Sequence, residues 1–198
     1  MAVSKPQKVS QPSQVRLLTS PVRQEIVDTL AALGGEASVS AIADELGRPA
    51  DGLYYHLREL IRGGLVLERP DSSTNERLFR LKGGRGPIRL TYQLFPGGNG
   101  EELGEFARVL LQIALQDFEA ALKIEGVATD GPRRELWVSR NKGWLSAGDR
   151  EEVVALLERL SELTSQPKAP GRDRLMSLGF SLAPLQPLAK RRTRGPDA

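Results

Sequence analysis

The sequence predicts an α+β protein in which three short helices and a β hairpin come first, followed by a long helix and a small α+β unit. Three observations predict it. Apolar residues recur at helical spacing between residues 22 and 64, a hairpin pattern follows at once, and a long stretch with no proline and a single glycine, Gly104, begins at Glu101. We expect four parts: a disordered tail at 1–15, the helices and hairpin at 16–86, an α+β unit at 87–186 and a basic disordered tail at 187–198.

Two helices are predicted in the first unit before residue 48. The first begins at Pro21, because Ser20 is a capping residue and proline fits the first helical position. It carries Val22, Ile26, Leu30 and Leu33 at helical spacing, up to the break at Gly34 and Gly35. Ser38 is placed to cap the second helix, and Gly47 ends it.

The third helix, residues 49–62, has one face for burial and another for contact. On a helix, Leu53, Leu57, Leu60 and Gly64 share a narrow face, and Asp51, Tyr55, Arg58 and Arg62 gather opposite it. Pro49 marks the start of this helix, and Gly63 and Gly64 mark its end. Residues 65–67 and 77–82 then predict a hairpin around the turn-rich stretch PDSSTNE.

Four stretches of this unit carry a family resemblance. SPVRQEIVDTLAALGG, SVSAIADELG, LYYHLRELIRGGLV and ERLFRLKG together resemble the winged helix-turn-helix domain of ArsR-like transcriptional regulators, over about residues 16–83. The resemblance implies sequence-specific binding to double-stranded DNA, with helix 49–62 in the major groove and wing 65–82 on the backbone. We also expect a homodimer on a palindromic operator, because a single winged helix reads too few bases and two-fold symmetry matches a palindrome, and we expect a repressor in preference to an activator.

The groups predicted to contact DNA lie on the exposed face of the third helix and on the wing. Arg58 and Arg62 can offer paired N–H donors to guanine or to phosphate, and Arg58 is better placed to read bases. Tyr54 either contacts DNA or packs into the core, and Asp51 either accepts from cytosine N4 or orients an arginine. The full set is Asp51, Tyr54, Tyr55, Arg58, Arg62, Arg77, Arg80 and Lys82.

Charge supports nucleic-acid binding only locally. The chain carries a formal net charge of +3. Residues 16–85 hold ten basic and ten acidic side chains, whereas the last twelve residues hold four and one. Within the domain, the run from Arg77 to Arg89 has no acidic residue. The neutral domain keeps open an alternative, a winged helix that binds protein instead of DNA, and the basic tail is either solubilising or a phosphate-binding arm.

Beyond the wing, residues 88–94 alternate as a half-buried strand and residues 101–125 form a long helix. The apolar stripe of this helix is too broad for an isolated helix. We expect it to hold a homodimer chiefly through Leu103, Phe106, Leu110 and Ile113; the alternative is that the stripe packs on the protomer's own strands.

The last hundred residues predict a second small unit. Its expected elements are a strand at 135–140, a turn at 141–143 with a short return at 144–145, a helix at 149–163 and a strand at 176–183. Between these strands and the long helix the unit either encloses a pocket for a small organic effector or only enlarges the dimer interface.

Composition argues against several other functions. The chain has no cysteine and one histidine, so the thiolate and imidazole ligands of soft-metal sensors are missing, and no cofactor is expected. The same shortage argues against an enzyme, because no His-based triad can form and the acidic pairs sit in solvated helix turns. His56 flanks the leucine face, and we expect it to be packed and hydrogen-bonded. No stretch is apolar enough to span a membrane, and the N-terminus lacks a secretory signal, so we expect a cytoplasmic protein.

Overall fold

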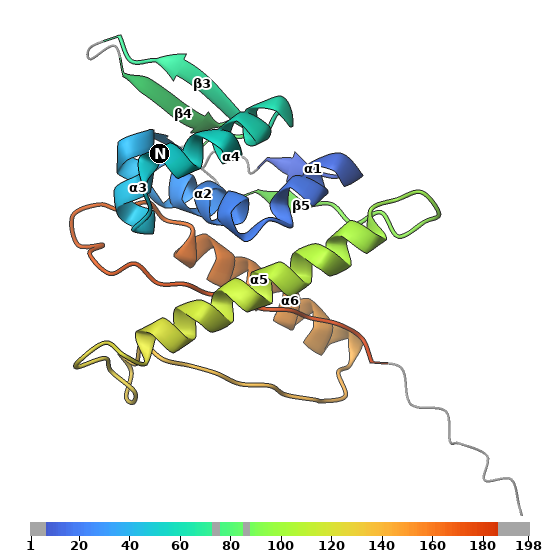
Figure 1. The fold of residues 1–198 in the computed structure, drawn as a ribbon. Helices are drawn as coiled ribbons and strands as arrows, with labels where there is room; N and C mark the ends of the chain where they lie inside the picture. Colours follow the sequence, from blue (N-terminus) through green and yellow to red (C-terminus); the bar gives the residue numbers. More distant parts are fainter. Residues whose placement is uncertain (1–6, 73–75, 85–87, 186–198) are drawn as a thin grey trace, which may run out of the picture.

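The computed structural model describes residues 7–72, 76–84 and 88–185 (Figure 1). The chain contains both helices and strands, which confirms a mixed α and β fold. In chain order the elements are β1 (Lys8–Val9), α1 (Pro12–Leu18), α2 (Pro21–Ala32), β2 (Glu36–Ser38), α3 (Val39–Leu46), α4 (Ala50–Arg62), β3 (Val66–Pro70), β4 (Arg77–Leu81), β5 (Arg89–Leu90), α5 (Gly100–Ala121) and α6 (Ala147–Thr164).

The N-terminal half packs α2, α3 and α4 around one core and closes it with a small sheet. Leu30, Ile42 and Leu57 are fully buried at the centre of the core. The sheet is antiparallel in the order β2-β4-β3, with Phe79 of β4 opposite Ala37 of β2 and Glu68 of β3. β3 and β4 form the predicted wing. β2 was not predicted, because three residues between two helices are too short to show an alternating pattern.

The helix boundaries follow the predicted capping residues. The Ser38 hydroxyl accepts a hydrogen bond from the Ala41 backbone N–H at 3.2 Å, and Gly47 ends α3 at φ 61°. Pro49 precedes α4, whose buried residues are Leu53, Leu57 and Leu60, as predicted. Gly64, at φ 69°, then turns the chain from α4 into β3.

The predicted N-terminal tail at 1–15 is wrong for the residues that are described. Lys8–Val9 pairs in parallel with Arg89–Leu90, α1 begins at Pro12, and both Val9 and Val15 are fully buried. The prediction failed because Val9 and Val15 are isolated apolar residues in a polar stretch, and their burial depends on β5, far along the chain. Residues 1–6, and the predicted basic tail at 187–198, lie outside the described residues.

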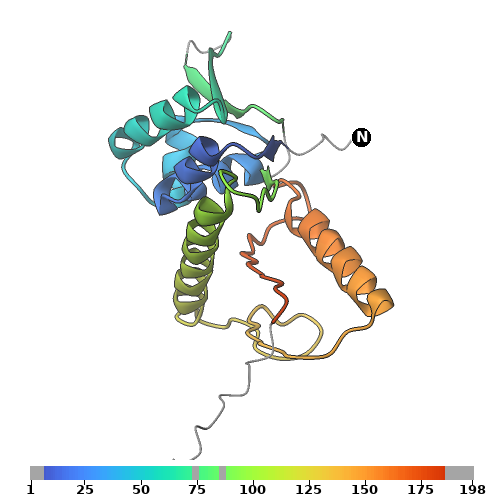
Figure 2. The same ribbon diagram turned by 90° about the vertical axis from the view of Figure 1, so that its right-hand side faces the viewer.

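The two helices of the C-terminal half form close to the predicted positions, but its strands do not. Residues 135–145 and 176–183 belong to no strand, and the strand predicted at 88–94 is reduced to Arg89–Leu90. A strand needs a hydrogen-bonded neighbour as well as an alternating sequence, and the described residues provide none to these segments. Figure 2 shows α5 and α6 leaving the N-terminal half as two separate arms, with the C-terminal segment between them. None of the described helices is long and apolar enough to cross a membrane.

Candidate nucleic-acid interface

A groove of about 430 Å³ runs between α4 and the wing. Asp51, Tyr54 and Arg58 line it from α4, and Glu68 and Arg77 line it from the two wing strands. Because residues 51, 54 and 58 are three and four apart, they fall on one side of the helix, where the hairpin meets it. The structure therefore brings four of the eight predicted DNA-contacting residues, Asp51, Tyr54, Arg58 and Arg77, to one groove.

The arginines around this groove differ in how far their charge is neutralised. Arg62 is ion-paired with Glu59 on the same helix, and Arg77 is ion-paired with Glu68 across the wing at 3.1 Å. Arg58 is exposed and donates through Nε to the Tyr54 backbone carbonyl at 3.3 Å; among the described residues it has no carboxylate partner. Arg58 thus keeps its charge available, whereas Arg62 and Arg77 must leave or share a carboxylate to bind a phosphate.

The wing presents a second basic surface on its opposite face. Side chains alternate along a strand, so Arg77 and Phe79 face α4 while Arg80 points to the other side of the sheet. Arg80 lies across from Glu36 of β2, and Arg69 of β3 binds Glu36 with two hydrogen bonds of 2.7 and 2.5 Å. The Arg69 guanidinium lowers the pKa of the Glu36 carboxyl below its usual value, and the charge of Arg80 adds to this effect. Three groups thus share a net positive charge on the outer face of the wing.

The remaining predicted contacts divide between the surface and the interior. Tyr55 is 59% exposed, whereas Tyr54 packs partly against the core, which favours the core alternative for part of its ring. Lys82 is exposed, and its ammonium lies near Gly64, where a Cβ would come within 3.6 Å of it. A cation at this place faces the C-terminal end of α4, which carries a partial negative charge.

His56 is packed, but it is not hydrogen-bonded as predicted. Its Nδ1 is buried without a hydrogen-bond partner among the described residues, and its ring meets Tyr55 edge-to-face at 5.3 Å. Burial lowers the pKa of His56 below its usual value, and the charges of Arg23 and Arg48 lower it further. The lowered pKa favours the neutral form of the ring.

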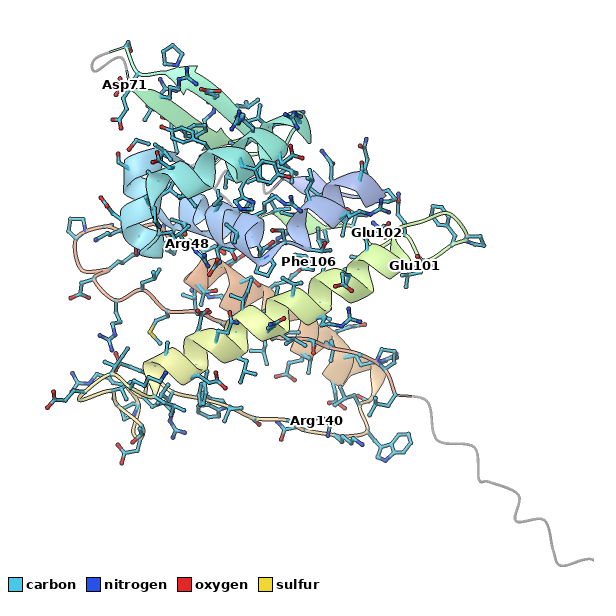
Figure 3. The ribbon with its side chains drawn as sticks, viewed as in Figure 1. Arg48, Asp71, Glu101, Glu102, Phe106 and Arg140 are labelled. Atoms are coloured by element: carbon cyan, nitrogen blue, oxygen red, sulfur yellow. The ribbon has the colours of Figure 1, made fainter. Side chains whose placement is uncertain are left out.

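Two of the four residues predicted to hold a homodimer face the protomer itself. Leu103 is buried in the N-terminal core, and Phe106 packs against that core (Figure 3). Leu110 and Ile113 are half-buried. The exposed apolar residues of α5 lie elsewhere on the helix, at Leu111 and Leu115. The first turns of α5, up to the buried Val109, thus join this helix to the N-terminal half, and its later turns are only partly covered.

Residues 7–18 form a clasp that sequence reasoning missed; it joins the ends of α4 and of the wing to the start of α5. Gln14 Nε2 donates to the Gly63 carbonyl at 2.8 Å, and Gln7 Oε1 accepts from the Gly83 N–H at 3.1 Å. The fully buried Asn99 donates through Nδ2 to the Ser10 and Thr91 carbonyls, both at 2.8 Å, and accepts from the Gln93 N–H at 2.9 Å. Glycine pairs at 63–64 and 83–84 were signals of close approach, because a Cβ on Gly63 would clash with Leu17 at 2.0 Å.

Comparison with known proteins gives the class of this site. A family described as a helix-turn-helix domain matches residues 18–69, which run from the end of α1 to within β3. No match to the chain was found among curated proteins. The chain thus carries a helix-turn-helix domain, which supports a DNA-binding regulator in general. The match includes α4 and therefore the groove residues Asp51, Tyr54 and Arg58. It does not include β4 or the C-terminal half.

Across 7–72, 76–84 and 88–185, no three histidine or carboxylate side chains are grouped so that they could hold a metal ion. The two strands predicted to wall an effector pocket with α5 are also not formed there.

Proposed function

We propose that this protein is a sequence-specific transcriptional regulator of the ArsR-like winged-helix type, that it acts as a homodimer on a palindromic operator in the cytoplasm, and that it is not an enzyme. α4 lies in the major groove and the wing lies along the phosphate backbone. Repression is the favoured direction, because a dimer bound over an operator excludes other proteins from the same DNA.

The observation that carries this proposal is the groove between α4 and the wing. It places the unpaired guanidinium of Arg58 beside Asp51 and Tyr54 on the exposed side of the helix that a helix-turn-helix domain uses for reading. A guanidinium offers two parallel N–H donors, which match O6 and N7 of guanine. Arg80 and Arg69, on the outer face of the wing, are placed to meet phosphates.

The proposal does not include sensing of a soft metal, because the chain has no cysteine and its one histidine is half-buried and alone. A small organic effector remains part of the proposal only if assembly creates a pocket in the C-terminal half.

The test combines operator selection with two substitutions. Fragments bound from random DNA would define the operator, and Arg58→Ala should then cost about 1 to 3 kcal/mol and relax the preference at one base position. Arg80→Ala should weaken all sequences about alike and reduce the salt slope by about one. Arg159→Ala removes an exposed, acid-paired arginine of α6 and serves as the control, with no expected effect. Unchanged affinity and sequence preference in Arg58→Ala would exclude α4 as the reading helix.

A second candidate function is a winged-helix module that binds another protein. The acid pairs of Arg48, Arg62, Arg69 and Arg77 favour it, because they leave this surface close to neutral. Salt separates the two functions, since DNA binding must weaken steeply between about 50 and 200 mM salt as counterions are added, and a near-neutral protein contact must not.

A further inference from the structure

The described residues after Val109 include many apolar side chains but form no hydrophobic core of their own. Every buried hydrophobic residue among those described lies between Val9 and Val109. From Leu111 to Leu185, eighteen large apolar side chains are each at least 40% exposed. Monomeric proteins rarely expose so much contiguous apolar surface, so this half is shaped to pack against another molecule.

The most exposed part is the segment 136–145, which connects the end of α5 to α6. Trp137, Val138 and Trp144 are 70%, 81% and 95% exposed. Within the described part of the chain, no backbone hydrogen bond involves residues 136–145. An extended backbone with free donors and acceptors beside exposed aromatic rings is a template for pairing with another chain.

The chain's other extended segment, residues 174–185, does not pair with segment 136–145. Segment 174–185 begins beside segment 136–145, because Arg174 Nε binds Glu135 Oε1 at 2.7 Å, but it then runs along α5. Ser177 Oγ donates to Asp117 Oδ2 at 2.6 Å, and Gly179 lies so close to Ala114 that a Cβ there would approach to 2.9 Å. The two extended segments are thus held together only at their starts, and no other described segment of the protomer pairs with the backbone of 136–145.

Resting on the proposed homodimer, we infer that segment 136–145 docks on the C-terminal half of a second copy of this chain and buries Trp137, Val138 and Trp144 there. Charge favours this occupant. Residues 133–142 carry four basic side chains and one acidic, whereas α6 carries five acidic and two basic, so the segment of one copy complements the helix of the other.

The amount of apolar surface also favours a second copy. A stable interface of standard size removes roughly 800 Å² from each partner, and two buried tryptophans at roughly 150 to 250 Å² each would supply about a third of that or more. The exposed Leu111 and Leu115 of α5 and Leu156 and Leu160 of α6 add to it. A partner that covers so large an apolar surface must be present in the cell whenever this chain is made. A second copy of the same chain always meets that condition.

The first experiment is light scattering with paired substitutions. The intact chain should be dimeric at tens of micromolar, and Val138→Asp combined with Trp144→Asp should raise the dimer dissociation constant at least tenfold. Tyr92→Asp is the matched control, because it also removes an exposed apolar ring, at 72% exposure, but lies outside the C-terminal segments. If the double variant loses helical circular dichroism, it is not folded, and the cross-linking experiment below then decides whether segment 136–145 docks on a second copy.

The second experiment uses the absence of cysteine in the chain. Chains with a single cysteine at Val138, Ser139 or Asn141, each mixed with Ala155→Cys chains that carry the cysteine on the exposed side of α6, should give covalent dimers with a short bis-maleimide. Asp44→Cys chains, with the cysteine on α3, should give none in the same mixture. A mixture of Ser139→Cys and Ser177→Cys chains tests pairing between the two extended segments of different copies.

The outcomes separate this inference from the homodimer on which it rests. A monomeric intact chain would overturn both. A dimer that keeps its dissociation constant in the double variant and gives no covalent product from any cysteine at 138–141 would overturn the docking of 136–145 and leave a dimer held by α5 alone. Covalent dimers from that segment would support the inference even if the aspartate variant is poorly folded.

Discussion

The two halves of the molecule both contain amphipathic helices, and the shorter helices of the N-terminal half bury far more apolar surface than the longer helices of the C-terminal half. In the N-terminal half, α2, α3 and α4 have three or more buried residues each, and their apolar residues meet across a shared core. In the C-terminal half, the eighteen residues of α6 include none that is buried. The difference teaches that an amphipathic sequence is enough to predict a helix, but the stability of that helix depends on what covers its apolar face.

The largest expected effect contrasts one leucine from each half. Leu57→Ala should lower the free energy of unfolding by about 2 to 5 kcal/mol, because Leu57 is fully buried and its removal leaves a cavity. Leu156→Ala should cost less than about 0.5 kcal/mol in dilute protein, because that side chain is 57% exposed. Urea unfolding followed by circular dichroism at two protein concentrations would measure both.

The tryptophans sharpen this test, because Trp137 and Trp144 are the chain's only two and both lie in the C-terminal half. Their fluorescence should report a transition that moves with protein concentration, whereas unfolding of the N-terminal half should not move with it. If Leu156→Ala were as costly as Leu57→Ala at every concentration, the C-terminal half would have a core of its own and the comparison would be wrong.

The next largest effect concerns the joint between the halves. Asn99→Ala should cost about 2 to 4 kcal/mol, because it leaves the Gln93 N–H and the Ser10 and Thr91 carbonyls without their partner in a buried place. Asn141→Ala is the control: it removes an exposed amide bonded to Ser139 at 3.0 Å and should change little. A loss in Asn99→Ala no larger than in the control would mean that water replaces these bonds and that the clasp is not rigid.

Sequence alone predicted α2, α3, α4 and the wing because their signals are local. Ser38, Gly47 and Gly64 mark helix ends through backbone preferences that neighbours do not change, and the leucine spacing of α4 shows which face is buried. The clasp at 7–18 could not be predicted, because Val9 is buried by pairing with residues eighty positions away. The strands at 135–140 and 176–183 were predicted from alternation, which reports the preference of a segment but not the presence of a neighbour.

The candidate site was predictable in its members but not in its geometry. Arg58 and Arg77 were recognised from helix phase and from the hairpin, and the structure places them on one groove. That Arg77 and Arg80 face opposite sides follows from strand alternation, once β4 is known to run without a bulge. The acid partners Glu59, Glu68 and Glu36 were not foreseen, because which arginine a carboxylate chooses depends on side-chain placement across strands.

The smallest effect compares the same kind of helix cap in the two halves. The Ser38 hydroxyl caps α3 by accepting a hydrogen bond from the Ala41 N–H, and the Ser146 hydroxyl caps α6 by accepting one from the Asp149 N–H. The Asp149 carboxylate in turn accepts a hydrogen bond from the Ser146 N–H. Hydrogen bonding of its carboxyl group to the side chain and to the backbone N–H of Ser146 lowers the pKa of Asp149 below its usual value. As an isolated motif the cap of α6 is therefore the better one.

Ser38→Ala should nevertheless be the more costly change, by about 1 kcal/mol of global stability, because α3 unfolds only together with the core that holds Val39 and Ile42. Ser146→Ala should fray only the first turn of α6 in dilute protein, since no buried contact couples that turn to the rest of the chain. Amide hydrogen exchange distinguishes the two: faster exchange should spread over the whole N-terminal core in Ser38→Ala but stay within the first turn of α6 in Ser146→Ala. At concentrations where two copies associate, the Ser146 effect should grow, because the cap would then help to hold a helix that a second chain covers. An effect that is independent of concentration would place α6 outside the contact between copies.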